Sequence, residues 1–287
     1  MKYIENVIAF SCHDAWLYGI LSLPEQVAST GVLIVVGGPQ YRVGSHRQFT
    51  LLARSLAAHG VPVVRFDYRG MGDSEGSARI FDAVNDDIQA AIDCFFQKVP
   101  ELNELVILGL CDAASAATFY AHQDSRVSGL ILINPWVRTE EGIAKAYLKH
   151  YYFSRLFDKN LWQKILSGSF SFNAAIKSFG KLVGSVVMHG RRNDSITAGV
   201  NLEEYSLPER MYTGLHAFQG RILMILSGND LTAMEFSALL KSSSKWKMLI
   251  KSRNISRQNL QAADHTFSRK EWRDQVSSWI VAWLKLS

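Results

Sequence analysis

Short apolar segments that alternate with amphipathic ones constrain the fold of this chain more than any other feature. Segments that are apolar almost throughout occur at 31–36, 61–66, 105–110 and 127–134. Segments with apolar residues at helical spacing lie between them at 46–59, 83–98 and 112–122. Strands that are apolar on both sides are typical of a parallel sheet covered by helices on both faces. The pattern therefore predicts an α/β fold, preceded by a β-hairpin from segments 3–10 and 16–23.

The alternation is interrupted once. Residues 137–215 are rich in lysine, aromatic residues and serine, and their 11 Lys+Arg against 7 Asp+Glu carry a net charge of +4. Strand and helix then resume at 221–226, 234–240 and 247–251, and a final amphipathic helix is expected at 268–285. We interpret residues 1–136 and 216–287 as one core and residues 137–215 as an inserted helical cap.

Charge and cysteine content exclude several classes of protein. The 31 Lys+Arg and 26 Asp+Glu give a net charge of +5, and no nucleic-acid-binding module is present, so nucleic acid is not an expected partner. No apolar run approaches the ~20 residues that span a bilayer, and the first residues do not resemble a signal peptide. Three cysteines are too few for a disulfide framework in 287 residues. We therefore expect a cytoplasmic protein without a transmembrane segment.

Cys111 has the setting of a catalytic nucleophile. It follows an apolar strand and precedes a helix of small residues, and the positions two before and two after it are Gly109 and Ala113. Such a strand, sharp turn and helix present a nucleophile, and the helix N-terminus favours a thiolate. The alternative is a small buried cysteine, an interpretation that we keep for Cys12 and Cys94.

The segment 65–76 carries a wider resemblance. Its Asp67-Tyr68-Arg69-Gly70-Met71-Gly72-Asp73-Ser74 run resembles the D-x-R-G-x-G-x-S loop of the α/β-hydrolase superfamily, in which we expect Asp67 and Arg69 to hold the loop. The resemblance implies an α/β-hydrolase fold with a mostly parallel central sheet flanked by helices. It also implies a catalytic acid after a late strand and a histidine before the last helix.

Asp230 and His265 occupy those two positions. The order Cys111, Asp230, His265 is that of the α/β-hydrolases and differs from those of chymotrypsin and subtilisin. Two alternatives stay open, since Asp230 is also a candidate N-cap for the helix that follows it, and any histidine is more often a surface or core residue than a base. Asp264 is a neighbouring carboxylate, but adjacent loop residues point apart.

An oxyanion hole needs two backbone N–H groups. One is expected from Asp112, after the nucleophile, and two orientations of its side chain stay open: a carboxylate beside the thiol, or a side chain that points into solvent at the first helical turn. The loop at 36–40 resembles the HGGP loops of related hydrolases with Val36 in place of histidine, and this match implies Gly38 as the second donor. Gln40 is the second choice, because Pro39 has no N–H.

The loop at 37–48, the Gly-Leu-Cys-Asp-Ala turn and the segment at 227–233 together resemble the exosortase A system-associated hydrolases of type 1. This resemblance implies a bacterial setting near exopolysaccharide and protein-sorting functions. Gln40, Arg42, His46 and Arg47 are candidate substrate-binding residues, with a solvated loop as the alternative. Bases and aromatic residues at 145–155 are candidates for contact with a membrane surface, a saccharide or an acyl carrier, unless they pack as a cap helix on the core.

The sequence thus predicts a cysteine hydrolase that cleaves an ester or thioester of a small-molecule or carrier-bound acyl substrate. We expect no cofactor and no metal, since no metal-ligand cluster, P-loop or dinucleotide fingerprint is present. Two alternatives stay open. The first is an acyltransferase that uses the same triad on a sugar or alcohol acceptor, and the second is an inactive hydrolase scaffold that acts as a binding module.

Overall fold

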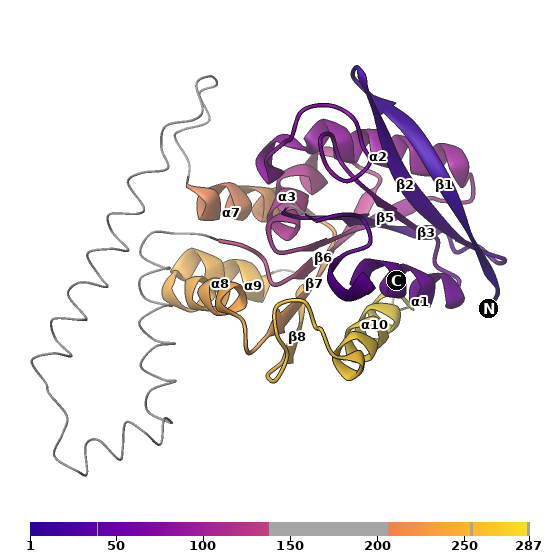
Figure 1. Cartoon of the computed structure of the whole chain (residues 1–287). Coiled ribbons are helices and arrows are strands. Elements are labelled where there is room, and N and C mark those ends of the chain that lie inside the picture. Colours follow the sequence, from indigo (N-terminus) through magenta and orange to yellow (C-terminus); the bar gives the residue numbers. More distant parts are fainter. Residues whose placement is uncertain (39, 138–205, 253–254, 286–287) are drawn as a thin grey trace, which may run out of the picture. The chain divides into compact units, whose positions relative to one another are not determined.

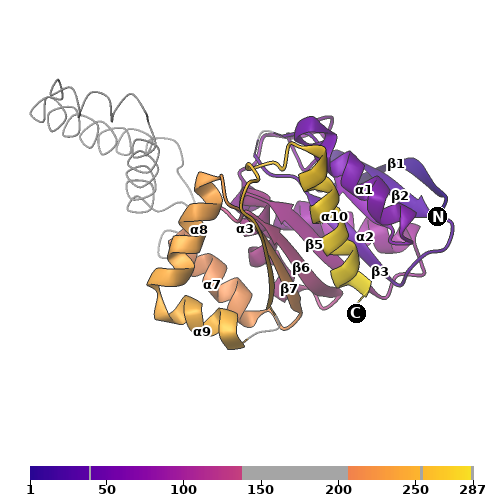
Figure 2. The same cartoon turned by 90° about the horizontal axis from the view of Figure 1, so that it is seen from below.

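A computed structural model gives the structure of residues 1–38, 40–137, 206–252 and 255–285 (Figures 1 and 2). Its centre is an eight-stranded sheet with the order β1-β2-β4-β3-β5-β6-β7-β8. The strands from β4 to β8 are mutually parallel, whereas β1 pairs with β2 and β2 with β4 in antiparallel fashion. The predicted α/β fold is confirmed.

The N-terminal hairpin consists of β1 (Tyr3–Cys12) and β2 (Ala15–Pro24). The predicted apolar strands follow as β3 (Thr30–Val35), β4 (Val63–Phe66), β5 (Glu104–Leu110), β6 (Val127–Ile133) and β7 (Arg221–Ser227). Nearly every residue of these five strands is buried. Their continuous apolar sequence thus reflects burial on both faces of the sheet.

Helices cover the sheet on both sides (Figures 1 and 2). On one face, α1 (Gln48–Ala58) and α10 (Lys270–Lys285) share a core with β3, β5, β6 and β7. On the other lie α2 (Asn85–Lys98) and α3 (Asp112–Tyr120). Cys12 in β1 and Cys94 in α2 are both buried, in agreement with their interpretation as packing residues.

The C-terminal part departs from the prediction in one place. Residues 247–251 belong to helix α9 (Ser244–Ser252), which follows α8 (Leu231–Ser242), and the last strand is β8 (Ile255–Leu260). The sequence Ile-Ser-Arg-Gln-Asn-Leu of β8 is polar, and no residue of this edge strand is buried. An edge strand needs no apolar run, so no sequence pattern marks it.

Most of the predicted cap, residues 138–205, lies outside the described residues, and the cap stays a prediction. Residues 1–137 and 209–287 form one compact unit. The helix α7 (Leu207–Ala217), whose residues up to 215 we assigned to the cap, packs on this unit, because Met211 and Leu215 are fully buried. In the described part of the chain, no helix is long and apolar enough to cross a membrane.

Candidate active site

Cys111 lies on a strained turn between β5 and α3. Its backbone has φ 62° and ψ −123°, a left-handed conformation that is rare for a residue with a side chain. A Cβ atom on Gly109 would lie 2.5 Å from the backbone of Ala113, so only glycine allows the helix to return this close to the strand. The requirement for a small residue before the turn is thus met in the structure.

Asp230 combines the two roles that its sequence position suggests. It is the N-cap of α8, and its carboxylate accepts hydrogen bonds from the N–H groups of Thr232 and Ala233 at 3.2 and 3.0 Å. The same carboxylate lies 2.9 Å from Nδ1 of His265. The capping bonds fix the direction of the carboxylate, so the N-cap supports the contact with histidine.

His265 lies between Asp230 and Cys111. Hydrogen bonds with Asp230 and then with the thiol of Cys111 raise the pKa of His265 to about 10, although burial of the ring opposes this shift. The imidazole ring is therefore in its doubly protonated, charged form at neutral pH, and its Nδ1–H donates a hydrogen bond to Asp230. Residues 111, 230 and 265 are thus brought together from the ends of three strands, β5, β7 and β8.

Asn134 is a site residue that the sequence analysis missed. It follows β6, is fully buried and has a positive φ of 44°. Its side-chain nitrogen donates to the carbonyl of His265 at 2.9 Å, and its side-chain oxygen accepts from the N–H of Ser227 at 2.8 Å. Asn134 therefore ties the histidine loop to the ends of β6 and β7. A polar residue at the end of an apolar strand is the signal that marks it.

The structure decides between the two orientations that the sequence leaves open for the side chain of Asp112. Its side chain does not point toward solvent: the residue is 8% exposed, and its carboxylate accepts hydrogen bonds from the N–H groups of Gly38 at 2.8 Å and Ala113 at 2.9 Å. The N–H of Gly38, which the loop pattern implies as an oxyanion donor, is therefore occupied by a carboxylate. The helix N-terminus explains this orientation, because it favours an anion.

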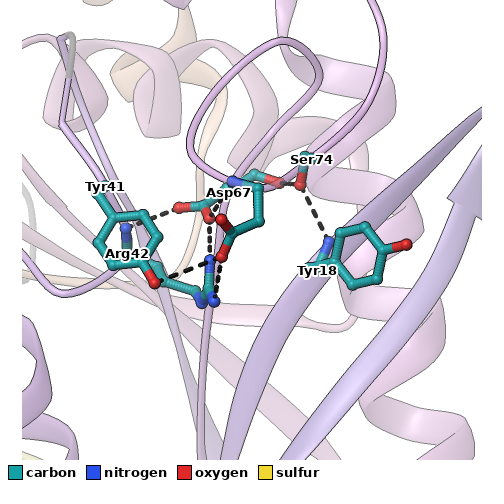
Figure 3. Close-up of polar contacts among 6 residues, drawn as sticks. Tyr18, Tyr41, Arg42, Asp67 and Ser74 are labelled. Atoms are coloured by element: carbon teal, nitrogen blue, oxygen red, sulfur yellow. Dashed lines mark hydrogen bonds and ion pairs between the residues drawn. The ribbon is translucent and has the colours of Figure 1, made fainter.

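Arg42 belongs to the network that holds the adjoining loops (Figure 3). Its guanidinium group pairs with the buried Asp67 and, at 2.7 Å, with Asp73, and its backbone N–H donates to Asp67 at 2.7 Å. Ser74 joins the same loop to the N-terminal hairpin, since its hydroxyl donates to the carbonyl of Asp67 and accepts from the N–H of Tyr18. Arg42 is thus already paired with two carboxylates, which leaves its predicted substrate contact without support.

Arg69 holds the loop from the other side. Its guanidinium group and its backbone N–H donate three hydrogen bonds of 2.8–2.9 Å to Asp87 at the start of α2, and both residues are buried. The loop-holding roles expected for Asp67 and Arg69 agree with these contacts.

The other predicted substrate-binding residues have different surroundings. The buried side-chain oxygen of Gln40 has no hydrogen-bond partner among the described residues, so it is available to a donor group. His46 and Arg47 are exposed and precede α1 with positive φ. Asp264 binds the backbone N–H and the hydroxyl of Ser268 rather than His265, as expected for neighbours that point apart. No group of His, Cys, Asp and Glu in the described part of the chain is arranged to hold a metal ion.

Comparisons with known proteins agree with this architecture. The structure is similar to that of an esterase from Pyrococcus furiosus, with a TM-score of 0.65 and 13% sequence identity over 99% of this chain and 91% of that one. It is also similar to Est1E from Butyrivibrio proteoclasticus with ferulic acid bound (TM-score 0.63, 12% identity, 96% and 97% covered). A third similar structure is a proline iminopeptidase from Mycobacterium smegmatis (TM-score 0.60, 14% identity, 98% of both chains covered). At these identities the likeness concerns the fold.

No curated protein matches the sequence. A family model described as serine aminopeptidase, S33, matches residues 30–232, a range that includes the turn at Cys111 and the acid Asp230. Because this match covers well over half of the chain and the fold agrees, the protein belongs to the serine aminopeptidase S33 family and is an α/β-hydrolase.

Proposed function

We propose that this hydrolase cleaves esters or thioesters with Cys111 as nucleophile, His265 as proton carrier and Asp230 as the residue that orients the histidine. The single observation that carries the proposal is the chain of contacts from Asp230 through His265 to Cys111, with 2.9 Å between Asp230 and Nδ1 of the ring. A thiol, an imidazole and a carboxylate in this order are the parts of an activated nucleophile.

In the acylation step, His265 either takes the proton of the Cys111 thiol or already pairs with its thiolate. The sulfur of Cys111 attacks the carbonyl carbon of the substrate and forms a C–S bond. The bond from that carbon to the leaving alkoxide or thiolate then breaks, and His265 gives its proton to the leaving group. The product of this step is a thioacyl enzyme and a free alcohol or thiol.

The second step consumes water. His265, now neutral, takes a proton from a water molecule, whose oxygen attacks the thioacyl carbon. The C–S bond breaks, the carboxylic acid leaves, and Cys111 returns as a thiolate beside the protonated ring. Asp230 keeps the same ring nitrogen protonated throughout, which leaves the other nitrogen to face the reacting atoms.

The proposed oxyanion hole consists of the N–H groups of Gly38 and Asp112. Both groups lie beside the nucleophile turn, since the carboxylate of Asp112 receives the Gly38 N–H at 2.8 Å. In comparable sites the loss of one such donor costs about 3–4 kcal/mol of transition-state stabilisation. A carbonyl oxygen reaches these donors only when the Asp112 carboxylate leaves them.

The finer setting rests on the sequence resemblance alone. We propose a cytoplasmic enzyme of a bacterial exopolysaccharide or exosortase system that acts on a small-molecule or carrier-bound acyl group, with residues 138–208 as its cap. The similar structures include an esterase and an enzyme with ferulic acid bound, which favours an ester among the candidate substrates.

Replacement of the nucleophile tests the proposal. The variant C111A should hydrolyse p-nitrophenyl acetate at least about 10³-fold more slowly than the wild type, because the covalent route is lost. The buried Cys12 and Cys94 provide matched controls, and C12A and C94A should keep their activity. Mass spectrometry of the quenched wild type should show an acetyl group on Cys111. Full activity of C111A would exclude this cysteine as the nucleophile.

A further inference from the structure

The carboxylate of Asp112 lies between the loop at Gly38 and the start of α3, a position that the sequence pattern of a nucleophile turn does not predict. One oxygen accepts the N–H of Gly38 at 2.8 Å, and the other accepts that of Ala113 at 2.9 Å. A carboxylate therefore already occupies the N–H of Gly38, one of the two donors proposed for the oxyanion of a substrate.

The surrounding backbone is shaped to hold this group. A Cβ atom on Gly37 would lie 1.9 Å from the carboxylate oxygen Oδ1 of Asp112, so only glycine at this position leaves room for the carboxylate. Gly38 has a positive φ of 59°, which turns the loop at this point. The carboxylate is therefore seated between the oxyanion loop and the start of α3 rather than placed there by a free rotation.

Two titratable groups from other elements face Asp112. The positive charge of His265 favours the ionised form of Asp112. Burial raises the pKa of Tyr68 to about 12, and the negative charge of Asp112 is the next largest cause of this rise. Burial raises the pKa of Asp112 itself, against the N–H donors and His265. No ion pair of Asp112 occurs among the described residues, so no cation is bound tightly enough to hold it permanently ionised.

We infer that Asp112 gates the oxyanion hole: its ionised carboxylate fills the hole and repels a developing oxyanion, and its protonation frees the hole for a carbonyl substrate. This inference rests on the proposed function. The protonated carboxyl group of Asp112 is a weaker acceptor, so the carbonyl oxygen of the substrate can accept the hydrogen bond from the N–H of Gly38 in its place. The O–H of the protonated Asp112 can donate a second hydrogen bond to that carbonyl oxygen as negative charge develops on it. Asp112 then determines which electrophiles react with Cys111 and at which pH.

Two reactions of the Cys111 sulfur can distinguish an effect of Asp112 on the oxyanion hole from an effect of Asp112 on the reactivity of the thiol. Acylation by p-nitrophenyl acetate forms an oxyanion, whereas alkylation by iodoacetamide displaces iodide at a saturated carbon and forms none. Both reactions need the thiolate of Cys111, so the fraction of Cys111 that is ionised drops out of the ratio of the acylation rate to the alkylation rate. We would measure this ratio between pH 5 and pH 9 for the wild type and the variants D112N and D112A, with modification of Cys111 followed by mass spectrometry and folding by circular dichroism.

If Asp112 gates the oxyanion hole, the ratio of acylation to alkylation should fall in the wild type as pH rises through the pKa of Asp112, because the protonated form of Asp112 is lost. In D112N and D112A, which carry no charge, the ratio should be flat, and at pH 8 at least about tenfold above the wild type. The asparagine is isosteric with the aspartate, so a folding defect of the alanine variant would not affect the result.

The other outcomes are distinct. If Cys111 is acylated and the ratio is the same in the wild type and both variants, or lower in both variants, the gate is wrong and the proposed nucleophile stands. If Cys111 is alkylated in all three proteins but acylated in none, the proposed function fails, and the gate fails with it.

Discussion

Asp230 shows at the scale of a single residue how one carboxylate serves fold and site together. It caps α8 through two backbone N–H groups and receives the Nδ1–H of His265. Asparagine at this position keeps an N-cap oxygen but loses the charge. Stability and proton affinity can therefore be separated here by one substitution.

The variant D230N should lower the pKa of His265 by at least about 1 unit from its value of about 10, because the hydrogen bond to Asp230 is the largest cause of the raised pKa and the charge of Asp230 adds to it. An NMR titration of the ring, assigned with H265Q, measures this. In the wild type the ring should lose its proton as pH rises through about 10, and in D230N at lower pH.

The matched control is D264N, one residue before the histidine, since Asp264 binds Ser268 and not the ring. This variant should leave the titration of His265 near that of the wild type. Equal shifts in D230N and D264N would contradict a specific role for Asp230. We also expect kcat/KM to fall about 10³–10⁴-fold in D230N alone.

At the scale of the elements, two buried contacts hold the loops around the site. The first joins Arg69 of the loop after β4 to Asp87 of α2 through three hydrogen bonds. The second is Asn134, which joins the end of β6 to β7 and to the histidine loop. Each is a point where the site depends on a contact between distant segments.

Removal of Asp87 takes away all three short hydrogen bonds to Arg69 and leaves its buried charge with only the longer contact to Asp86, at 3.6 Å. D87A should lower the free energy of unfolding by about 3–5 kcal/mol in urea denaturation. Asp86 is the neighbouring carboxylate on the same helix turn and contacts the same Arg69 at 3.6 Å, but its side chain is 60% exposed. D86A should change stability by less than about 0.5 kcal/mol. A similar decrease of the unfolding free energy in D87A and D86A would contradict a specific stabilising role of the buried Arg69–Asp87 pair.

Asn134 should affect stability and catalysis in different ways. N134A leaves the buried N–H of Ser227 without its acceptor, which should cost about 2 kcal/mol in urea denaturation. N134G loses the same bonds but tolerates the φ of 44°, so it should be the more stable of the two. Both should lower kcat/KM to a similar extent, since both release the carbonyl of His265. Wild-type kcat/KM in either variant would exclude a positioning role.

At the scale of the whole molecule, acid stability depends on carboxylates that are paired in the folded state. Burial would raise the pKa of Asp124, but hydrogen bonds from Arg126 and Tyr120 hold it at about 2, below the ordinary value of 3.8. Its contribution is fully present above pH 3.8 and is lost as pH falls through about 2.

Between pH 5 and pH 3 the wild type should therefore lose about 1 kcal/mol more unfolding free energy than D124N, as measured by urea denaturation at each pH. D93N is the control, because Asp93 pairs with the same Arg126 but has a side chain that is 56% exposed. Its acid sensitivity should remain close to that of the wild type. An identical pH dependence in the wild type and D124N would contradict the proposed linkage.

The sequence alone was sufficient for the features that depend on local pattern. Strands such as β3 and β5 are buried on both faces, so their apolar runs predicted both their positions and the parallel sheet. The turn at Cys111 was predictable because a sharp reversal requires Gly109, and Asp230 and His265 follow in the order that the superfamily resemblance implies.

Only the tertiary structure decided which polar groups meet. Asn134 and His265 are 131 residues apart, and Gly38 and Asp112 are 74 apart, so no local spacing predicts either contact. The side chain of Asp112 points inward because the N–H groups of Gly38 and Ala113 converge beside it. Arg42 pairs with Asp67 and Asp73. Apolar burial is recorded along the chain residue by residue, whereas a hydrogen bond exists only once both partners have been brought together by the fold.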